Sequence, residues 1–188
     1  MTARTERSGV LIPVSPDKTG TDGWSMSRSE IQDCDRQKLA EFIDQHWYGK
    51  LVITLGRQHY PHKEQGFIER HDGRIAGVLT YRVDEDGMQI LTVNSALEGR
   101  GIGSSLMLDA TEKARKLGCG RIWLTSTNEN LRAIGFYQRL GFRLVAVHLD
   151  TVEQMRKLKP RIPLADARGV PIQDEFVMEL KLEPYLDA

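Results

Sequence analysis

The chain has few cysteines, no excess of charge and no long apolar run, and each absence excludes a class of protein. Cys34 and Cys119 are the only cysteines among 188 residues and lie far apart, which leaves neither a C-x-x-C metal pair nor a disulfide framework. Lys and Arg together number 26, as do Asp and Glu, so no net basic charge is available to hold nucleic acid. No apolar run reaches the ~18 residues of a membrane span, and residues 1–9 lack the apolar segment of a signal peptide. We therefore expect a cytoplasmic protein with reduced thiols and with neither nucleic acid nor a membrane as partner.

The remaining composition is that of a globular protein, with hydrophobic residues making up 40% of the chain. At ~150 residues per domain, the length corresponds to about one domain. Residues 1–23 mix Thr, Ser, Gly and Pro, which favours a flexible N-terminal arm or leader. From residue 24 onward the apolar positions alternate between period 2 and period 3.6, as in alternating strands and helices. We expect a single domain over residues 24–188, of the α/β class in its layered α+β form.

The periodicity also places the individual elements. Strands are predicted at 24–28, 66–71, 74–83, 88–94, 121–127, 142–149 and 176–182, with 51–55 either a short strand or a helix extension. Helices are predicted around 39–46 and at 104–117, 128–140 and 151–158, and the polar, His-rich segment 56–65 is predicted as a loop. Asp72-Gly73 favours a tight hairpin turn, and a second turn is predicted at 84–87, so the strands at 66–71, 74–83 and 88–94 should form an antiparallel meander.

A glycine-rich segment, Glu98-Gly99-Arg100-Gly101-Ile102-Gly103-Ser104, lies between a predicted strand and a predicted helix. Glycines there let the main chain approach an anion, and the free N–H groups of the first helical turn point toward it. The spacing excludes the two common nucleotide motifs. A Rossmann loop needs G-x-G-x-x-G with an acidic residue ~20 positions later, and a Walker loop ends in Gly-Lys-Ser/Thr. Pyrophosphate is the expected ligand of this loop. For the loop taken alone, the alternative is a glycine-rich turn that binds no ligand.

A second segment, after the next predicted strand, completes a pattern that the loop alone does not define. It reads Asn130-Leu131-Arg132-Ala133-Ile134-Gly135-Phe136-Tyr137-Gln138-Arg139-Leu140-Gly141-Phe142. The two segments resemble the Q/R-x-x-G-x-G/A and N-x-x-A-x-x-F-Y-x-x-x-G-F motifs of the GNAT superfamily of acyl-CoA-dependent N-acetyltransferases. The resemblance extends in element order from about residue 24 to 142, and more loosely to 182.

The resemblance implies a mixed, mostly antiparallel sheet of six to seven strands flanked by helices, whose central strands splay apart to admit acetyl-CoA. It also assigns the cofactor contacts and the general acid. The pyrophosphate would be held by Gly99, Arg100, Gly101, Ile102, Gly103 and Ser104, and the pantetheine arm by the main chain of Val93 and by Asn130. Tyr137 would lie near the sulfur and return a proton to the departing thiolate. Glu98 departs from the usual Gln or Arg, so we expect its carboxylate to point away and Arg100 to supply the cation.

The residue that deprotonates the attacking amine is not evident, because 88–94 contains no Asp or Glu. His46 and His59 titrate in the useful range and lie where the family builds its acceptor wall, so they are the candidate bases; ordinary exposed histidines are the alternative. Trp47, Tyr48 and Tyr60 either line an acceptor pocket or cover the edge of the core. No metal site is expected, since the two histidines His59 and His62 make a poor ligand set for a metal ion.

The leading hypothesis is therefore an acetyl-CoA-dependent N-acetyltransferase acting on a primary amine of a small molecule, by direct attack in a ternary complex. Two alternatives stay open, a non-catalytic acyl-CoA-binding or sensing module and an acetyltransferase acting on a protein amine. A homodimer is left open as well.

Overall fold

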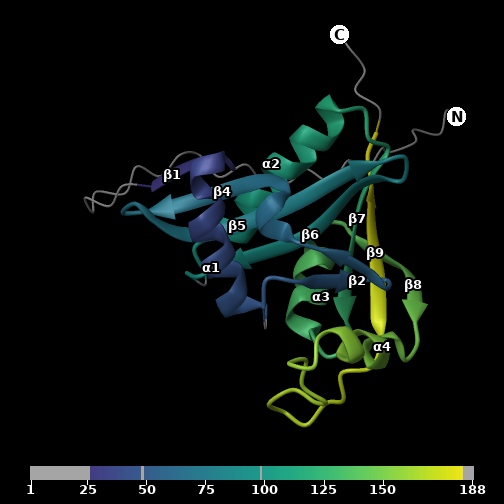
Figure 1. Cartoon of the computed structure of the whole chain (residues 1–188). Helices are drawn as coiled ribbons and strands as arrows, with labels where there is room; N and C mark the ends of the chain where they lie inside the picture. The colour runs from purple at the N-terminus through teal and green to yellow at the C-terminus, as the bar shows by residue number, and fades with distance from the viewer. Residues whose placement is uncertain (1–25, 48, 98, 184–188) are drawn as a thin grey trace, which may run out of the picture.

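The computed structural model describes residues 26–47, 49–97 and 99–183 (Figure 1). The predicted arm at residues 1–23 therefore lies outside the described residues, as do Trp24, Tyr48 and Glu98. The strands are β1 (Met26–Glu30), β2 (Val52–Thr54), β3 (Arg57–His59), β4 (Gln65–His71), β5 (Arg74–Asp84), β6 (Gly87–Ser95), β7 (Arg121–Thr127), β8 (Arg143–His148) and β9 (Glu175–Lys181). The helices are α1 (Arg36–His46), α2 (Ile102–Lys116), α3 (Leu131–Arg139) and α4 (Thr151–Leu158), with short 3₁₀ turns η1 (Asp33–Asp35) and η2 (Pro61–Lys63).

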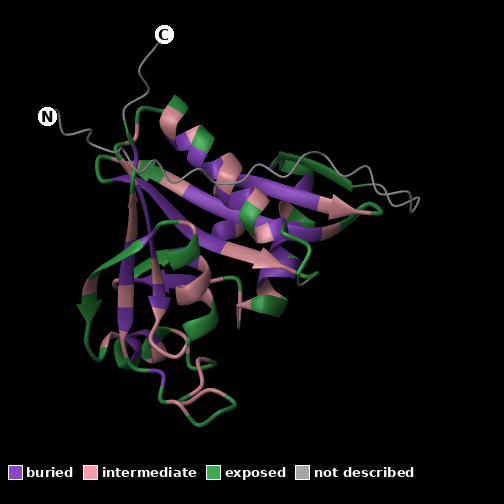
Figure 2. Cartoon of the chain, turned by 180° about the vertical axis from the view of Figure 1, so that it is seen from behind, coloured by how far each residue is buried: buried purple, intermediate pink, exposed green. Residues whose placement is uncertain are grey.

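Seven of the strands form one sheet in the order β1-β4-β5-β6-β7-β9-β8. Every neighbouring pair is antiparallel except β6 and β7, which are parallel. Helices α2 and α3 cover one face of this sheet, whereas α1 and the separate β2–β3 hairpin lie on the other (Figures 1 and 2). The predicted mixed, mostly antiparallel sheet of six to seven strands flanked by helices is thus confirmed.

Three apolar clusters hold these layers together. The largest joins α2, α3 and one face of the central strands, and includes Leu106, Leu124 and Met178. A second packs Leu39 and Ile43 of α1 against the opposite face, and a third packs Ile53 of β2 against α4 (Figure 2). Both faces of the central strands are therefore covered, which explains why β7 has three consecutive apolar residues, Ile122, Trp123 and Leu124.

One glycine fixes where α2 begins. A Cβ on Gly77 in β5 would lie 2.3 Å from Cγ2 of Ile102, the first residue of α2. No other residue type allows the strand and the helix to approach so closely. The start of α2 is consequently held against the middle of the sheet.

Most predicted elements are confirmed, including the hairpin at Asp72-Gly73, where both residues have positive φ. The loop predicted at 56–65 is wrong in part, because residues 57–59 form β3 and 61–63 form η2. The turn between β2 and β3 uses Leu55 and Gly56 with φ of 47° and 75°, and Leu-Gly is not a common sequence for such a turn. Two helix boundaries also move, since α2 begins at Ile102 rather than 104, and α3 begins at Leu131 rather than 128.

Candidate functional site

The central feature of the site is a gap between β6 and β7. The two strands pair only through Met88, Gln89 and Ile90 of β6, the last of which lies opposite Leu124 of β7. Beyond that level, residues 91–95 and 125–127 have no partner on the other strand. Parallel strands that separate in this way leave main-chain groups free to bond a third, extended chain.

Val93 presents its main chain to this gap. The amide of Ala96 donates to the carbonyl of Ala76 at 2.8 Å, which marks Ala96 as a hydrogen-bonded position of the β5–β6 ladder. Hydrogen-bonded and non-bonded positions alternate along an antiparallel pair, so Val93, three residues earlier, belongs to the non-bonded set. Its N–H and C=O therefore point away from β5 and toward β7, as an extended pantetheine arm requires.

The glycine loop forms a cradle at the start of α2. Gly99 and Gly101 have φ of 72° and 76°, a left-handed conformation that favours glycine. A Cβ on either residue would have no atom within 4 Å, so the space in front of the loop is open. No side chain of the described residues caps α2, which leaves the first N–H groups of the helix for an external anion.

The charges around the cradle favour an anion. Arg100 and Ser104 are both exposed, and no ion pair among the described residues involves Arg100. The guanidinium and the serine hydroxyl can therefore both turn toward a phosphate. The predicted orientation of Glu98 cannot be compared with the structure, because Glu98 lies outside the described residues.

Helix α3 brings the second motif to the same face. Asn130 is its N-cap, with Oδ1 accepting a hydrogen bond from the amide of Ala133 at 3.3 Å, so its side-chain nitrogen is the group that can donate outward. Tyr137 is buried, with ring centroids of Phe136 and Phe142 at 5.3 and 5.8 Å. Burial raises the pKa of the Tyr137 phenol, so the hydroxyl keeps its proton at neutral pH.

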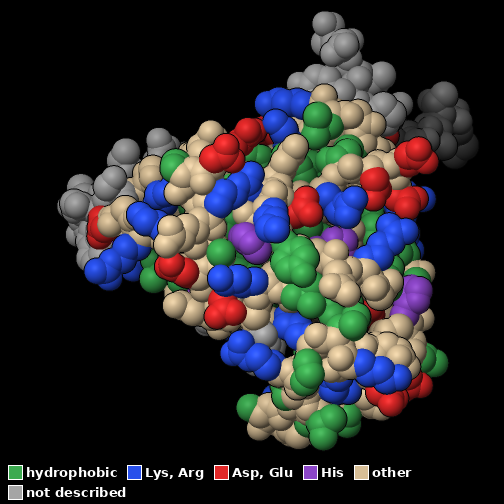
Figure 3. Space-filling model, in the orientation of Figure 1, with side chains coloured by type: hydrophobic (Ala, Val, Ile, Leu, Met, Phe, Trp, Pro, Cys, Tyr) green, Lys and Arg blue, Asp and Glu red, His purple; other side chains and the backbone are tan. Residues whose placement is uncertain are grey.

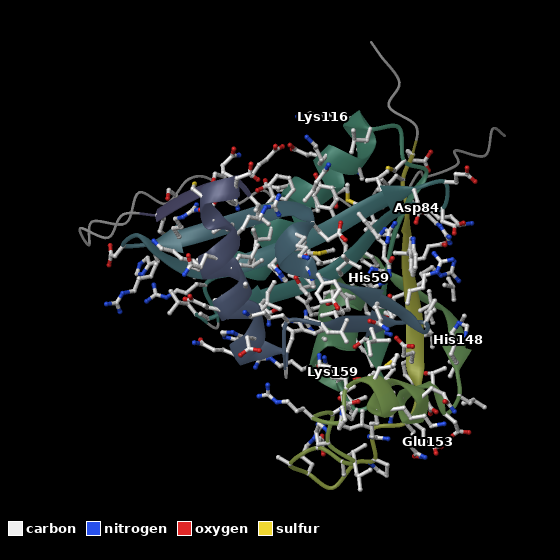
Figure 4. All side chains as sticks on the ribbon, in the orientation of Figure 1. His59, Asp84, Lys116, His148, Glu153 and Lys159 are labelled. Carbon is white, nitrogen blue, oxygen red and sulfur yellow. The ribbon has the colours of Figure 1, made fainter. Side chains whose placement is uncertain are left out.

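The opposite face of the gap is bounded by α1, the linker after it and the β2–β3 hairpin. The indole N–H of Trp47 donates to Oδ1 of Asn94, which lies on the splayed part of β6. Lys159, at the end of α4, donates to the carbonyl oxygens of Trp47 and Leu51, both at 2.5 Å. These contacts fix the linker beside the gap (Figure 4, where Lys159 is labelled). Hydrophobic side chains are exposed over the middle of this face, with Lys and Arg around them (Figure 3).

The two histidines proposed as bases have different surroundings. His46 is exposed at the end of α1, stacks on Phe42 at 4.1 Å and shares a hydrogen bond of 2.7 Å between its Nδ1 and the Phe42 carbonyl. His59 is the last residue of β3 in the hairpin (labelled in Figure 4); it is 2% exposed, and its Nε2 is 2.9 Å from Oγ1 of Thr54. The Thr54 hydroxyl also accepts from Gln89 of β6 at 2.9 Å. Burial and the charges of two arginines, Arg82 and Arg57, lower the pKa of His59, so its imidazole is neutral at pH 7.

The aromatic residues predicted for an acceptor wall are only partly brought together. Trp47 is half-buried at the gap, whereas Tyr60 is exposed and stacks under Nζ of Lys63 at 5.2 Å. Tyr48 lies outside the described residues. Trp47 is thus the aromatic side chain that the structure places at the opening.

Sequence reasoning missed a buried carboxylate at this opening. Glu175, the first residue of β9, is 2% exposed, and its Oε2 accepts from the main-chain amide of Leu55 at 3.0 Å. Burial raises the pKa of this carboxyl, partly offset by the Leu55 amide and the Thr125 hydroxyl. An acidic residue immediately before the apolar alternation of β9 was the available signal.

Comparison with known proteins identifies the family. The sequence model of the Acetyltransferase (GNAT) family matches residues 26–142, which is more than half of the chain. The chain belongs to the GNAT family. The match includes the glycine cradle, Asn130 and Tyr137, and it ends before β8 and β9. None of the described helices is long and apolar enough to cross a membrane.

Relatives with sequence similarity are bacterial proteins. The chain is 34% identical over 146 residues to the uncharacterized protein YxbD of Bacillus subtilis, covering 77% of this chain and 92% of YxbD. It is 39% identical over 136 residues to the streptothricin acetyltransferase of Streptomyces lavendulae, covering 70% of this chain and 57% of that enzyme. Among solved GNAT structures, a Bacillus subtilis acetyltransferase in complex with CoA superposes with a TM-score of 0.60 at 19% identity, covering 85% of this chain and 99% of that one. This chain is accordingly a GNAT acetyltransferase in both sequence and fold.

Proposed function

We propose that the chain transfers an acetyl group from acetyl-CoA to a primary amine of a small molecule, by direct attack of the amine on the thioester in a ternary complex. The proposal is carried by one observation: the open gap between β6 and β7, which the main chain of Val93 faces, continues into the glycine cradle at the start of α2. A donor with an extended arm and a pyrophosphate matches both parts at once. The streptothricin acetyltransferase relative supports a small-molecule acceptor.

Each residue of the two motifs has a separate task in this proposal. The cradle, from Gly99 through Ser104, binds the pyrophosphate with main-chain N–H groups, and Arg100 supplies the positive charge. The main chain of Val93 bonds the pantetheine arm and polarises the thioester carbonyl, while Asn130 donates to the arm from the other side. Tyr137 protonates the thiolate as it leaves.

The acceptor enters from the face bounded by Trp47 and the β2–β3 hairpin. His46 and His59 are the bases that the sequence suggests for the amine's proton, and their surroundings are unequal. The neutral, buried imidazole of His59 is in the protonation state that a base needs, whereas His46 shares its Nδ1 with its own helix.

Release of free CoA from acetyl-CoA by the pure protein tests the proposal. The panel contains alkylamines, arylamines, amino acids and a lysine-containing peptide. Release with a small amine supports the proposed function. Release with the peptide alone would assign a protein acceptor, and CoA binding without release with any acceptor would assign a binding module.

A further inference from the structure

The carboxylate of Glu175 is buried, and burying a carboxylate for a structural role alone costs free energy. Taking an ionised carboxyl out of water is unfavourable unless hydrogen bonds replace the lost hydration. The amide of Leu55 provides one such bond from the hairpin turn. The hydroxyls of Thr125 on β7 and Thr151 on α4, together with the charge of His148 on β8, lower the pKa, but burial outweighs them and raises it. Glu175 is therefore a partly satisfied carboxyl that binds a proton more readily than an exposed glutamate.

The strand register places this carboxyl at the gap. Thr125 is the first residue of β7 beyond Leu124, where pairing with β6 ends, and its side chain is partly exposed. Thr125 and Thr127 share one sheet face by alternation, and Thr127 is the register partner of Glu175. The Thr125 hydroxyl thus lies between the opening and the buried carboxyl.

The Thr125–Glu175 pair and Tyr137 lie on opposite faces of the sheet. Leu124 and Met178 belong to the cluster that contains Tyr137, and strand alternation puts Thr125 and Glu175 on the opposite side of the sheet. The proposed acid and the Thr125–Glu175 pair therefore flank the gap from its two faces. This separation suits acyl transfer, because one group can give a proton to the thiolate while another takes a proton from the amine.

Building on the proposed function, we propose that Thr125 and Glu175 together accept the proton of the acceptor amine. The N–H bond of the ammonium breaks as its proton passes to Oγ1 of Thr125, and the proton already on Oγ1 passes to the Glu175 carboxylate. One proton leaves the nitrogen before attack, and the nitrogen keeps the freed electron pair for attack on the thioester carbon. After attack the nitrogen loses a second proton, which balances the proton that Tyr137 gives to the thiolate. The raised pKa of Glu175 narrows the difference in basicity between carboxylate and amine that this transfer must overcome.

Two acceptors separate proton removal from every other role of these residues. The first is an alkylamine, which is protonated at pH 7. The second is an arylamine, which is already uncharged at pH 7 and needs no proton removed before attack. Glu175→Gln keeps an oxygen for the Leu55 amide but removes the basic group. We expect turnover of the alkylamine to fall ~10²-fold or more, and turnover of the arylamine to stay within a few-fold of wild type.

Variants at Thr125 give an independent check. Thr125→Val removes the hydroxyl with little change in shape and should show the same selective loss, whereas Thr125→Ser should restore alkylamine turnover. Equal slowing of both acceptors by Glu175→Gln would mean that the carboxyl only anchors the hairpin, and this result overturns the proposal. A selective loss in His59→Gln or His46→Gln, with Glu175→Gln fully active, also overturns it. Wild-type protein that binds CoA but releases none from acetyl-CoA with any amine of the panel would refute the proposed function itself, which is a different result.

Discussion

In the proposed function, Tyr137 combines two roles in one side chain, packing in the core and donating a proton. Its ring lies among Phe136 and Phe142, and its buried phenol has a raised pKa. A raised pKa keeps the proton available but makes donation to a finished thiolate unfavourable, since a thiol has a pKa of only about 8.5. The transfer should therefore accompany cleavage of the carbon–sulfur bond rather than follow it.

Tyr137→Phe isolates the second role, because the ring and its packing stay while the proton is lost. We expect kcat to fall ~10²-fold with the affinity for CoA unchanged, as is typical for loss of a general acid. Steady-state kinetics with the best amine of the panel, together with CoA titration, make the measurement. Tyr81→Phe is the matched control, because Tyr81 is another buried tyrosine of the same cluster. Full activity in Tyr137→Phe would move the acid role to another group.

At the scale of elements, Lys159 joins α4 to the linker between α1 and β2. Its ammonium donates to the carbonyls of Trp47 and Leu51, which flank the position where the linker passes the gap. Burial, with the charge of Arg161, lowers the pKa of Lys159 to about 8. The contact therefore places a titrating group beside the opening proposed for the acceptor.

Lys159→Met keeps a long apolar side chain and removes the donors. We expect the KM for the amine to rise several-fold with CoA affinity unchanged, and the free energy of unfolding to fall by ~1–3 kcal/mol, about the value of two such bonds. The pH dependence has a definite sign. Between pH 8 and about 10.4 the unfolded chain binds a proton at Lys159 that the folded chain does not, so wild-type stability should rise with pH relative to Lys159→Met.

Urea unfolding at pH 7 and pH 9.5 measures this difference. Lys157→Met is the control, since Lys157 is exposed on the same helix and bonds Oε1 of Gln154. If Lys159→Met has the same free energy of unfolding as wild type at both pH values and the same KM for the amine, Lys159 does not hold the linker as proposed.

For the molecule as a whole, the sequence predicts those elements and motifs whose sequence patterns lie within a few neighbouring residues. Strand alternation, the Asp72-Gly73 turn and the two motifs each lie within a few residues, and all of them are found in the structure. The β2–β3 hairpin was missed because Arg57 and Gln58 are polar and exposed and its turn sequence is Leu-Gly. Glu175 was missed because its meaning depends on Leu55, 120 positions away, and on Thr125 across the sheet. Long-range pairings of this kind leave no periodicity in the sequence.

Binding of CoA at the cradle should stabilise the entire fold, because a ligand that binds only the native state shifts the unfolding equilibrium by mass action. At 100 times the dissociation constant the gain is ~2.7 kcal/mol, which for a chain of this length corresponds to a rise in Tm of about 5–10 °C. Gly101→Asp should abolish the shift, because its carboxylate would enter the open space of the cradle with the wrong charge. Gly118→Asp is the matched control: Gly118 also has positive φ, also has no atom within 4 Å of a Cβ, and lies beyond the other end of α2. Both substitutions strain a left-handed glycine, so a melting series with CoA separates that shared cost from loss of the ligand. A wild-type Tm that ignores millimolar CoA would count against the CoA site, and a full shift in Gly101→Asp would place the pyrophosphate elsewhere.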